Sequence, residues 1–283
     1  MRILQALTFS ILLVFPQANM FASNEPFYKK IDYSNIDLIG IVKDKGKGEY
    51  KIRTVQPLSI DEENGDTIFL QGMIGNFSQF GKYRVGTNLG IGFRNFSDDY
   101  QKLYGYNFFY DSEPDPGHHR LGLGLELKKA RFGISNNYYK GLTGKKSYGA
   151  SGMKEEVLDG VDIIVSGLIP RFEWVETDLS YAYWDSVASS DLYEIKLGLN
   201  FSLNDYLTLK LEAEDDNKSS ITYNAGISIN FGGKKSNKVS LSGSNQNIVE
   251  EDMRAYNLIP VKRSEKLTLE QTGGFSVKVK KSG

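Results

Sequence analysis

The sequence predicts an all-β fold: a 12-stranded antiparallel transmembrane β-barrel. Three observations predict it. Segment after segment alternates apolar and polar residues with a period of two. The chain has 17 Tyr, 16 Phe and 29 Gly among its 283 residues, a mixture that suits strands and tight turns. Beyond the N-terminal segment, the sequence has no apolar run of the ~20 residues that a transmembrane helix needs.

Charge and cysteine content exclude several classes of protein. The formal net charge is −1, so there is no case for a basic face that binds nucleic acid. The absence of cysteine excludes a disulfide framework and thiolate chemistry. No phosphate-binding loop or cofactor motif is present, so we expect no cofactor.

The first 22 residues have the layout of a cleaved secretory signal. Met1-Arg2 supplies a positive charge, and residues 3–15 are mostly apolar. The small residues Ala18 and Ala22 then offer two possible cleavage sites. The apolar core of about 13 residues is too short for an uncleaved membrane anchor. We therefore expect a signal peptide over residues 1–22, then a short N-terminal segment over 23–35.

The alternation is clearest from Lys82 to Arg94. Odd positions from Tyr83 to Phe93 are mostly apolar, and even positions carry charge, amide or glycine. Such patterns divide the region 36–232 into strands separated by Gly, Pro, Asn and Asp. The predicted strands cover residues 36–43, 49–59, 66–77, 82–95, 101–111, 119–128, 131–140, 160–169, 173–184, 191–203, 206–214 and 220–231.

The composition of the two strand faces predicts which one meets lipid. A soluble barrel would bury the apolar face, but the polar face here carries many glycines, which only weaken a solvated strand. Inside a barrel, those glycines make room for an occupant of the lumen. The apolar face ends in aromatic residues, as from Tyr83 to Phe93 and from Tyr223 to Phe231, which fits the girdles at membrane interfaces. Because backbone groups in lipid must all be paired, the sheet has to close, and outer-membrane lipid is an expected partner.

The lengths of the connections predict the orientation of the barrel. If the first strand starts in the periplasm, connections after odd strands face outward and are longer. The longest connection, Gly141 to Asp159, follows the seventh strand, whereas the short turns Lys129-Ala130 and Asn204-Asp205 follow even strands. The connections over 96–100 and 78–81 fit this rule less well.

The last strand resembles the terminal signal that barrel-assembly machinery reads in outer-membrane proteins. Its signal positions are Asn224, Gly226, Ile229 and Phe231. The resemblance implies that this machinery and periplasmic chaperones are partners during biogenesis, with pairing at the strand edge. The alternative is an ordinary alternating strand with a chance glycine.

Several blocks in the barrel region recur in a family pattern. They are Asn88–Arg94, Leu103–Asp111 and His119–Glu126, followed by Tyr138-Tyr139 and Asp159–Ile163. In order and spacing they resemble the inverse autotransporters, the intimin and invasin group, over roughly residues 36 to 270. The resemblance implies a translocator barrel of the bacterial outer membrane.

A further block lies beyond the barrel. Residues 253–263 and 267–270 resemble the linker of that family, which turns back through the lumen and emerges outside. The resemblance implies a linker over 233–270 that threads the lumen and a short C-terminal tail over 271–283. The barrel would then export its own C-terminal segment.

Charged side chains of the polar face are candidates for lining the lumen. They would pair with charges of the linker, or else with one another around a water-filled wall, and both alternatives stay open. The lining candidates are Arg84, Arg94, Arg120, Glu126, Asp162, Asp178, Lys196, Lys210 and Glu212. The linker candidates are Glu250, Glu251, Arg254, Lys262 and Arg263.

Two differences from the family bear on function. The segment 23–35 is too short for a folded domain, so we expect none of the peptidoglycan-binding domain that many relatives carry there. The sequence ends at Gly283, soon after the linker block, so we expect no immunoglobulin-like passenger. An adhesive role and a receptor therefore stay open.

His118 and His119 are weak candidates for chemistry. Adjacent residues of an extended segment point apart, so they chelate one ion poorly. A Ser–His hydrolase needs a nucleophile and an orienting group, and no supporting spacing is visible. Glu214-Asp215-Asp216 opens a predicted outward loop, where a solvated charged loop is a simpler expectation than a Ca²⁺ site. We expect no enzyme and no bound metal.

Two functions from different classes follow from these observations. The first is a non-enzymatic anchor and translocator that exports its own C-terminal segment and acts at most as a minimal adhesin. The alternative is a small diffusion pore with its C-terminal tail in the periplasm. A hydrolase would depend on His118 or His119.

Overall fold

The computed structural model describes residues 35–147, 152–232, 251–273 and 276–281. The predicted signal peptide, almost all of the short N-terminal segment and the first part of the predicted linker lie outside the described residues. The domain boundaries proposed for those parts stay predictions.

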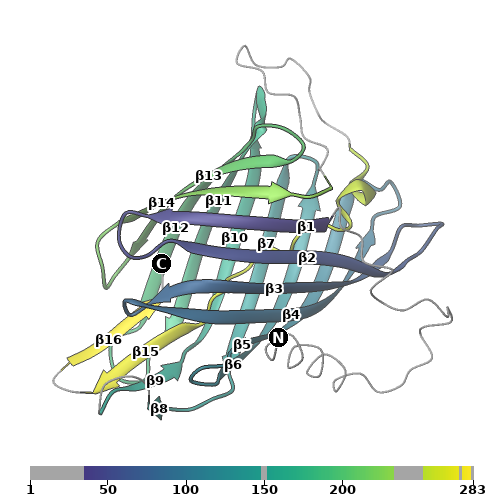
Figure 1. Cartoon of the computed structure of the whole chain (residues 1–283). Helices are drawn as coiled ribbons and strands as arrows, with labels where there is room; N and C mark the ends of the chain where they lie inside the picture. The colour runs from purple at the N-terminus through teal and green to yellow at the C-terminus, as the bar shows by residue number, and fades with distance from the viewer. Residues whose placement is uncertain (1–34, 148–151, 233–250, 274–275, 282–283) are drawn as a thin grey trace. The chain divides into compact units, whose positions relative to one another are not determined.

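The described residues contain a closed barrel of twelve antiparallel strands (Figure 1). The barrel strands are β1 (Ile36–Lys43), β2 (Glu49–Ile60), β3 (Thr67–Gln79), β4 (Lys82–Phe96), β5 (Lys102–Glu113), β6 (His118–Lys129), β7 (Phe132–Gly141), β10 (Asp159–Ile169), β11 (Phe172–Asp185), β12 (Leu192–Ser202), β13 (Leu207–Asp216) and β14 (Thr222–Asn230). Each strand pairs with the next barrel strand in the chain. The seam between β1 and β14 runs from Asp37 opposite Asn230 to Lys43 opposite Asn224. This closed ring confirms the predicted fold class.

Each barrel strand begins and ends within two residues of its predicted range, and the hairpin that joins β5 and β6 is one example. The first strand was expected to end at Asp111 and the second to begin at His119. Their backbones stay paired as far as Glu113 opposite His118, so only a tight turn over 114–117 remains. The hairpin therefore rises further from the barrel than the alternation alone predicted.

The apolar face of the strands is exposed and the polar face is buried. In β4, Tyr83 and Val85 are 49% and 51% exposed, whereas Arg84 and Arg94 are 3% and 0% exposed. An exposed apolar belt around a closed sheet is the surface that lipid requires. Separately, none of the helical segments in the described residues is long and apolar enough to span a membrane.

A second sheet joins parts of the chain that are far apart in sequence. Its strands, in spatial order, are β16 (Ser276–Lys281), β15 (Thr268–Gly273), β9 (Lys154–Val157) and β8 (Lys146–Ser147). The sequence predicted only a loop between Gly141 and Asp159 and only a tail after Glu270, so these strands were missed. The sequence of β9, Lys-Glu-Glu-Val, has no apolar alternation, and it becomes a strand by pairing with β15.

Candidate functional site: the polar face and the C-terminal segment

Two glycines of β4 make room for aromatic rings on the buried face. A Cβ atom at Gly90 would overlap the ring of Phe109, and one at Gly92 would overlap the ring of Phe69. Both rings are buried and pack with Val261. The space was assigned to an occupant of the lumen, but at these positions the barrel's own rings fill it and support the C-terminal segment (residues 251–273).

The C-terminal segment follows β3 along its whole length. Three hydrogen bonds mark its course: Asn257 Nδ2 to Thr67 Oγ1 (3.2 Å), Val261 N to Gln71 Oε1 (2.8 Å) and Gln79 Nε2 to the Leu267 carbonyl (3.2 Å). β3 begins at Thr67 and ends at Gln79, so contacts with the segment extend from one end of this barrel strand to the other.

The segment begins beside the turns that precede β3 and β5. The Met253 amide donates to the Tyr100 carbonyl (2.8 Å), and the Arg254 guanidinium lies 3.8 Å from the centre of the Tyr100 ring. A Cβ atom at Gly65 would lie 2.7 Å from the Arg254 side chain. The residues 253–256 form a short 3-10 helix, η3 (Met253–Tyr256), at this end of the barrel (Figure 1).

Arg94 joins the barrel wall to the start of the segment. Its Nη2 and Nε donate to Glu126 Oε2 at 2.9 and 3.1 Å. Its Nη1 donates to the carbonyls of Asn257 (2.8 Å) and Ile259 (2.7 Å). The carboxylate neutralises the guanidinium, and the remaining donors fix the backbone of the segment.

Asp111 lies between two guanidinium groups, one from the wall and one from the segment. Arg120 Nε donates to Asp111 Oδ2 (2.9 Å), and Arg263 donates to both carboxylate oxygens. Nη2 and Nη1 of Arg120 also donate to the carbonyls of Ser264 (2.7 Å) and Lys266 (3.1 Å), respectively. Two positive charges around one buried carboxylate are satisfied because Arg120 also bonds main-chain acceptors of the segment.

A polar chain on β7 and β10 fixes the middle of the segment. The Tyr139 hydroxyl donates to Asp162 Oδ2 (2.7 Å) and accepts from the Ser264 amide (2.7 Å). Asn137 Nδ2 donates to Asp162 Oδ1 (2.7 Å) and to the Lys262 carbonyl (3.1 Å). Here the backbone groups of the segment form hydrogen bonds with side chains of the barrel. In a β-sheet they would bond to the backbone of a neighbouring strand.

Charged side chains of the segment point to opposite parts of the wall. Lys262 Nζ contacts Asp178 (2.6 Å) and Glu176 (2.7 Å) on β11. Glu265 pairs with Lys51 and with Arg53, 3.0 Å from Oε1 to Nη1, on β2.

The assignment of nine residues to the lumen wall stays a prediction, and their contacts are of several kinds. Four contact the segment directly: Arg94, Arg120, Asp162 and Asp178. Glu126 acts through Arg94. Arg84 binds a different part of the chain, because its two Nη atoms hold Glu155 of β9 at 2.7 and 2.6 Å.

The other three candidates belong to β12 and β13. Lys196 lies 2.8 Å from Glu214 and 3.8 Å from Glu212, and Glu212 accepts from Asn224 (2.9 Å). Lys210 is half-buried on the same strand as Glu212, and it interacts electrostatically with Glu265 and Lys262 of the segment. Lys196 and Glu212 therefore pair with other residues of the wall, which is the alternative that the sequence left open.

The five linker candidates also divide. Lys262 and Arg263 bind the wall, whereas Arg254 pairs with Asp252 (2.7 Å) inside the segment. The Arg254 guanidinium holds the pKa of the Asp252 carboxyl below its usual value. Glu251 accepts from the Tyr256 hydroxyl (2.7 Å), and Glu250 lies outside the described residues.

Asp111, Tyr139 and Glu265 are central to these contacts, but the sequence did not identify them as lining or linker candidates. The alternation from Leu103 places Asp111 on the buried face of β5, so its parity was a usable signal. Glu265 falls in the gap between the two linker blocks, and nothing in the local pattern distinguishes it.

The predicted assembly signal lies on the closing strand. Asn224 is buried, and a Cβ atom at Gly226 would lie 2.8 Å from the Gly40 carbonyl across the seam. Ile229 and Phe231 are exposed on the apolar face. Recognition by assembly machinery stays a prediction.

Both histidines have structural partners. His119 Nδ1 lies 2.7 Å from the Tyr110 hydroxyl, and the two rings stack. His118 Nδ1 lies 3.3 Å from Thr143 Oγ1, and its Nε2 lies 3.8 Å from Glu155. These contacts join the β5–β6 hairpin to the connection between β7 and β10.

The acidic run Glu214-Asp215-Asp216 forms the end of β13 and not the start of a loop, because these residues pair with β12. Asp216 accepts from the amides of Lys218 (2.7 Å) and Ser219 (2.6 Å), and Glu214 pairs with Lys196. Within the part of the chain that the structure describes, no group of three or more metal-ligating side chains could hold an ion.

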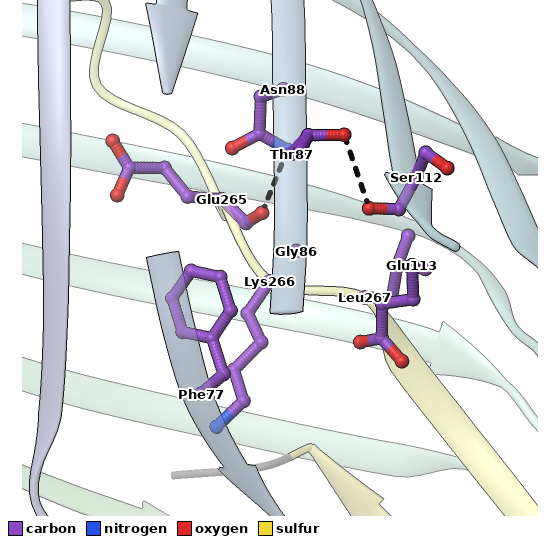
Figure 2. A pocket seen from close by; sticks show the side chains of 9 residues that line it. All are labelled: Phe77, Gly86, Thr87, Asn88, Ser112, Glu113, Glu265, Lys266 and Leu267. Carbon is purple, nitrogen blue, oxygen red and sulfur yellow. Dashed lines mark hydrogen bonds between the residues drawn. The ribbon is translucent and has the colours of Figure 1, made fainter. Parts of the chain in front are cut away.

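A narrow packing gap without room for a water molecule lies between the segment and β3, β4 and β5. Figure 2 shows Asn88 of β4 donating to the Glu265 carbonyl (2.9 Å) at its edge. Lys266 passes beside Phe77, with Nζ 5.6 Å from the ring centre, and Glu113 lines the other side. The segment thus packs closely against the wall in this region.

Comparison with known proteins gives one consistent family. Residues 24–264 match the family model "Inverse autotransporter, beta-domain". Intimin of Citrobacter freundii is 26% identical over 190 residues, covering 60% of this chain and 20% of that protein. Intimin of Escherichia coli O127:H6 (strain E2348/69 / EPEC) is 33% identical over 108 residues, covering 37% of this chain and 11% of that protein. The matches therefore span about a fifth or less of the length of these relatives.

A similar solved structure supports the fold. The structure described as "Unveiling the Mechanism Behind the in-meso Crystallization of Membrane Proteins" has a TM-score of 0.65 and 18% identity, covering 84% of this chain and 100% of that chain. The family match covers most of the sequence, and the barrel has the lipid-compatible surface that outer-membrane proteins need. The chain therefore belongs to the inverse autotransporter β-domain family, and it is a β-barrel of the bacterial outer membrane.

Proposed function

We propose that this barrel holds residues 251–267 in its lumen and carries the chain beyond them to the cell surface. The observation that supports this most strongly is the course of the segment along β3, from Thr67 to Gln79. The partners of the segment are buried polar side chains of a closed barrel, and a closed barrel offers one passage between its two ends.

The direction of export follows from the connections. The segment begins beside the turn before β5, which the strand order predicts to be periplasmic, and β15 pairs with β9 in the longest outward connection. The order of contacts therefore leads from the periplasm to the outside. The outer loops and the chain beyond β15 would be the surface available to a minimal adhesin, in a protein without a catalytic role.

The proposal is tested by thiol labelling on intact cells. The chain has no cysteine, so Ser276→Cys in β16 is the single target of a membrane-impermeant maleimide. Matched targets are Ser219→Cys in an outward turn and Asp98→Cys in a periplasmic turn. We expect Ser276→Cys to label like Ser219→Cys. Labelling only after permeabilisation, as for Asp98→Cys, would contradict export and favour a pore with a periplasmic tail.

A further inference from the structure

We infer that β9 and the turn 186–191 bind β15 and hold the exported chain in its outward position. We call β9 and this turn the latch. The inference rests on the proposed export of the C-terminal segment. After export, the C-terminal segment must be kept from sliding back through the lumen.

The first part of the latch is a backbone pairing. β15 pairs with β9 in antiparallel register from Leu269 opposite Val157 to Thr272 opposite Lys154. The Leu158 amide extends the pairing by donating to the Thr268 carbonyl (3.0 Å). A short strand of this kind supplies affinity through main-chain hydrogen bonds, as in β-augmentation.

The second part is a small apolar cluster beneath this pairing. Leu267, Leu269 and Val157 are 2%, 0% and 5% exposed, and Phe80 from the turn after β3 packs against them. The cluster forms only when β15 lies against β9, because Leu267 and Leu269 come from the C-terminal segment. Burial of these side chains favours the latched state.

The third part is a cradle for one carboxylate. Glu270 accepts from the Ser186 hydroxyl (2.5 Å) and from the amides of Val187 (3.1 Å) and Ala188 (2.9 Å). Glu270 is 1% exposed, so these donors replace its hydration. Charge-assisted hydrogen bonds to backbone amides are strong and directional, so the turn 186–191 recognises this side chain.

The latch is fixed to the barrel by Glu155. This carboxylate of β9 is held by both Nη atoms of Arg84 on β4, and it also accepts from Gln271 Nε2 (3.1 Å) on β15. One carboxylate thus connects the wall, the outer connection and the exported strand. Since β9 has no strand pattern of its own, arrival of β15 orders this part of the outer connection.

The test measures protection of β9 in the full chain in intact cells. Val157→Cys lies in the buried cluster and is the single thiol. The rate at which an impermeant maleimide labels it therefore measures how often β15 separates from β9. We expect Glu270→Ala to accelerate this labelling by about tenfold or more, because a buried carboxylate bonded to three donors is lost. Leu269→Asp, which puts a charge in the cluster, should accelerate it further.

The matched control is Asp44→Ala in another outer turn. Asp44 also accepts a backbone hydrogen bond, from the Tyr223 amide (3.0 Å), but it does not contact β15. It should leave Val157→Cys labelling at the parental rate. Heat-modifiable gel mobility checks that every variant contains a folded barrel.

The latch is overturned if Val157→Cys labels at the same rate with and without the Glu270 and Leu269 substitutions in folded barrels. It is also overturned if the parental Val157→Cys protein already labels as fast as an exposed thiol. Ser276→Cys separates the two proposals: if it labels from outside while the latch test fails, export stands. If it is inaccessible from outside, export and the latch both fail.

Discussion

The Arg263 guanidinium and the Asp111 carboxylate form a bidentate ion pair between the C-terminal segment and the barrel wall. Nη1 lies 2.8 Å from Oδ1 and Nη2 lies 2.6 Å from Oδ2, and both side chains are almost fully buried. Arg263 also stacks 4.2 Å from the centre of the Phe109 ring. A buried pair of this geometry contributes mainly through the penalty of leaving either charge alone.

Substitution of Asp111 should therefore destabilise the folded chain strongly. Asp111→Ala leaves Arg120 and Arg263 without a carboxylate, and breaking a buried pair costs ~3–5 kcal/mol. The shift in the urea unfolding midpoint in detergent measures this cost. Lys140→Met is the control, because it removes an exposed pair with Asp159, and such pairs contribute below ~1 kcal/mol. Equal shifts for the two variants would contradict the central role of Asp111.

A side chain at Gly92 should impair folding of the barrel. Gly92→Val would place atoms within the Phe69 ring, and Arg94 stacks on that ring 4.5 Å from its centre. Overpacking costs ~1–3 kcal/mol, so we expect a smaller heat-modifiable fraction. Gly40→Val is the matched control, since nothing lies within 4 Å of a Cβ atom there. Normal folding of Gly92→Val would contradict this prediction and would mean that the Phe69 ring can shift to accept the side chain.

Truncation after Gly232 should open the barrel to ions. It removes the C-terminal segment, whose side chains and backbone occupy the polar face along β3, and it leaves all twelve barrel strands. We expect a marked rise in conductance in planar bilayers compared with the full chain. If the full chain already conducts as well as the truncated one, the diffusion-pore alternative gains support.

Phe231→Ala should slow assembly more than it affects the finished barrel. Phe231 is exposed at the end of the predicted assembly signal, so its loss removes little packing within the barrel. Pulse-chase analysis of heat-modifiable barrel should show slower appearance with an unchanged unfolding midpoint. Tyr206→Ala, also exposed, is the control outside the signal. Equal assembly rates for both variants would remove the signal interpretation.

The barrel could be predicted from the sequence because lipid imposes a simple rule on each strand. The predicted strand over 82–95 is observed as Lys82–Phe96, since every second side chain must face lipid and the others must not. The contacts of Lys262 and Arg263 with the barrel strands could be anticipated because buried charges need partners.

The second sheet could not be predicted, because the local sequences of its strands do not show a strand pattern without their partners. β9 contains two glutamates and a lysine in four residues, and it pairs with β15 more than a hundred residues further along the chain. Glu155 therefore looked like part of a polar loop, although it is the partner of Arg84. Tertiary pairing decided the conformation here, and local pattern did not.

The central claim, that the C-terminal segment lies within the barrel, is tested most directly by photocrosslinking at Lys262. A diazirine-bearing lysine analogue keeps the amine that contacts Asp178 and Glu176. In intact cells, we predict crosslinks within the same chain to peptides of β10 and β11. Crosslinks to lipid or to periplasmic proteins, with none to these two strands, would contradict the claim.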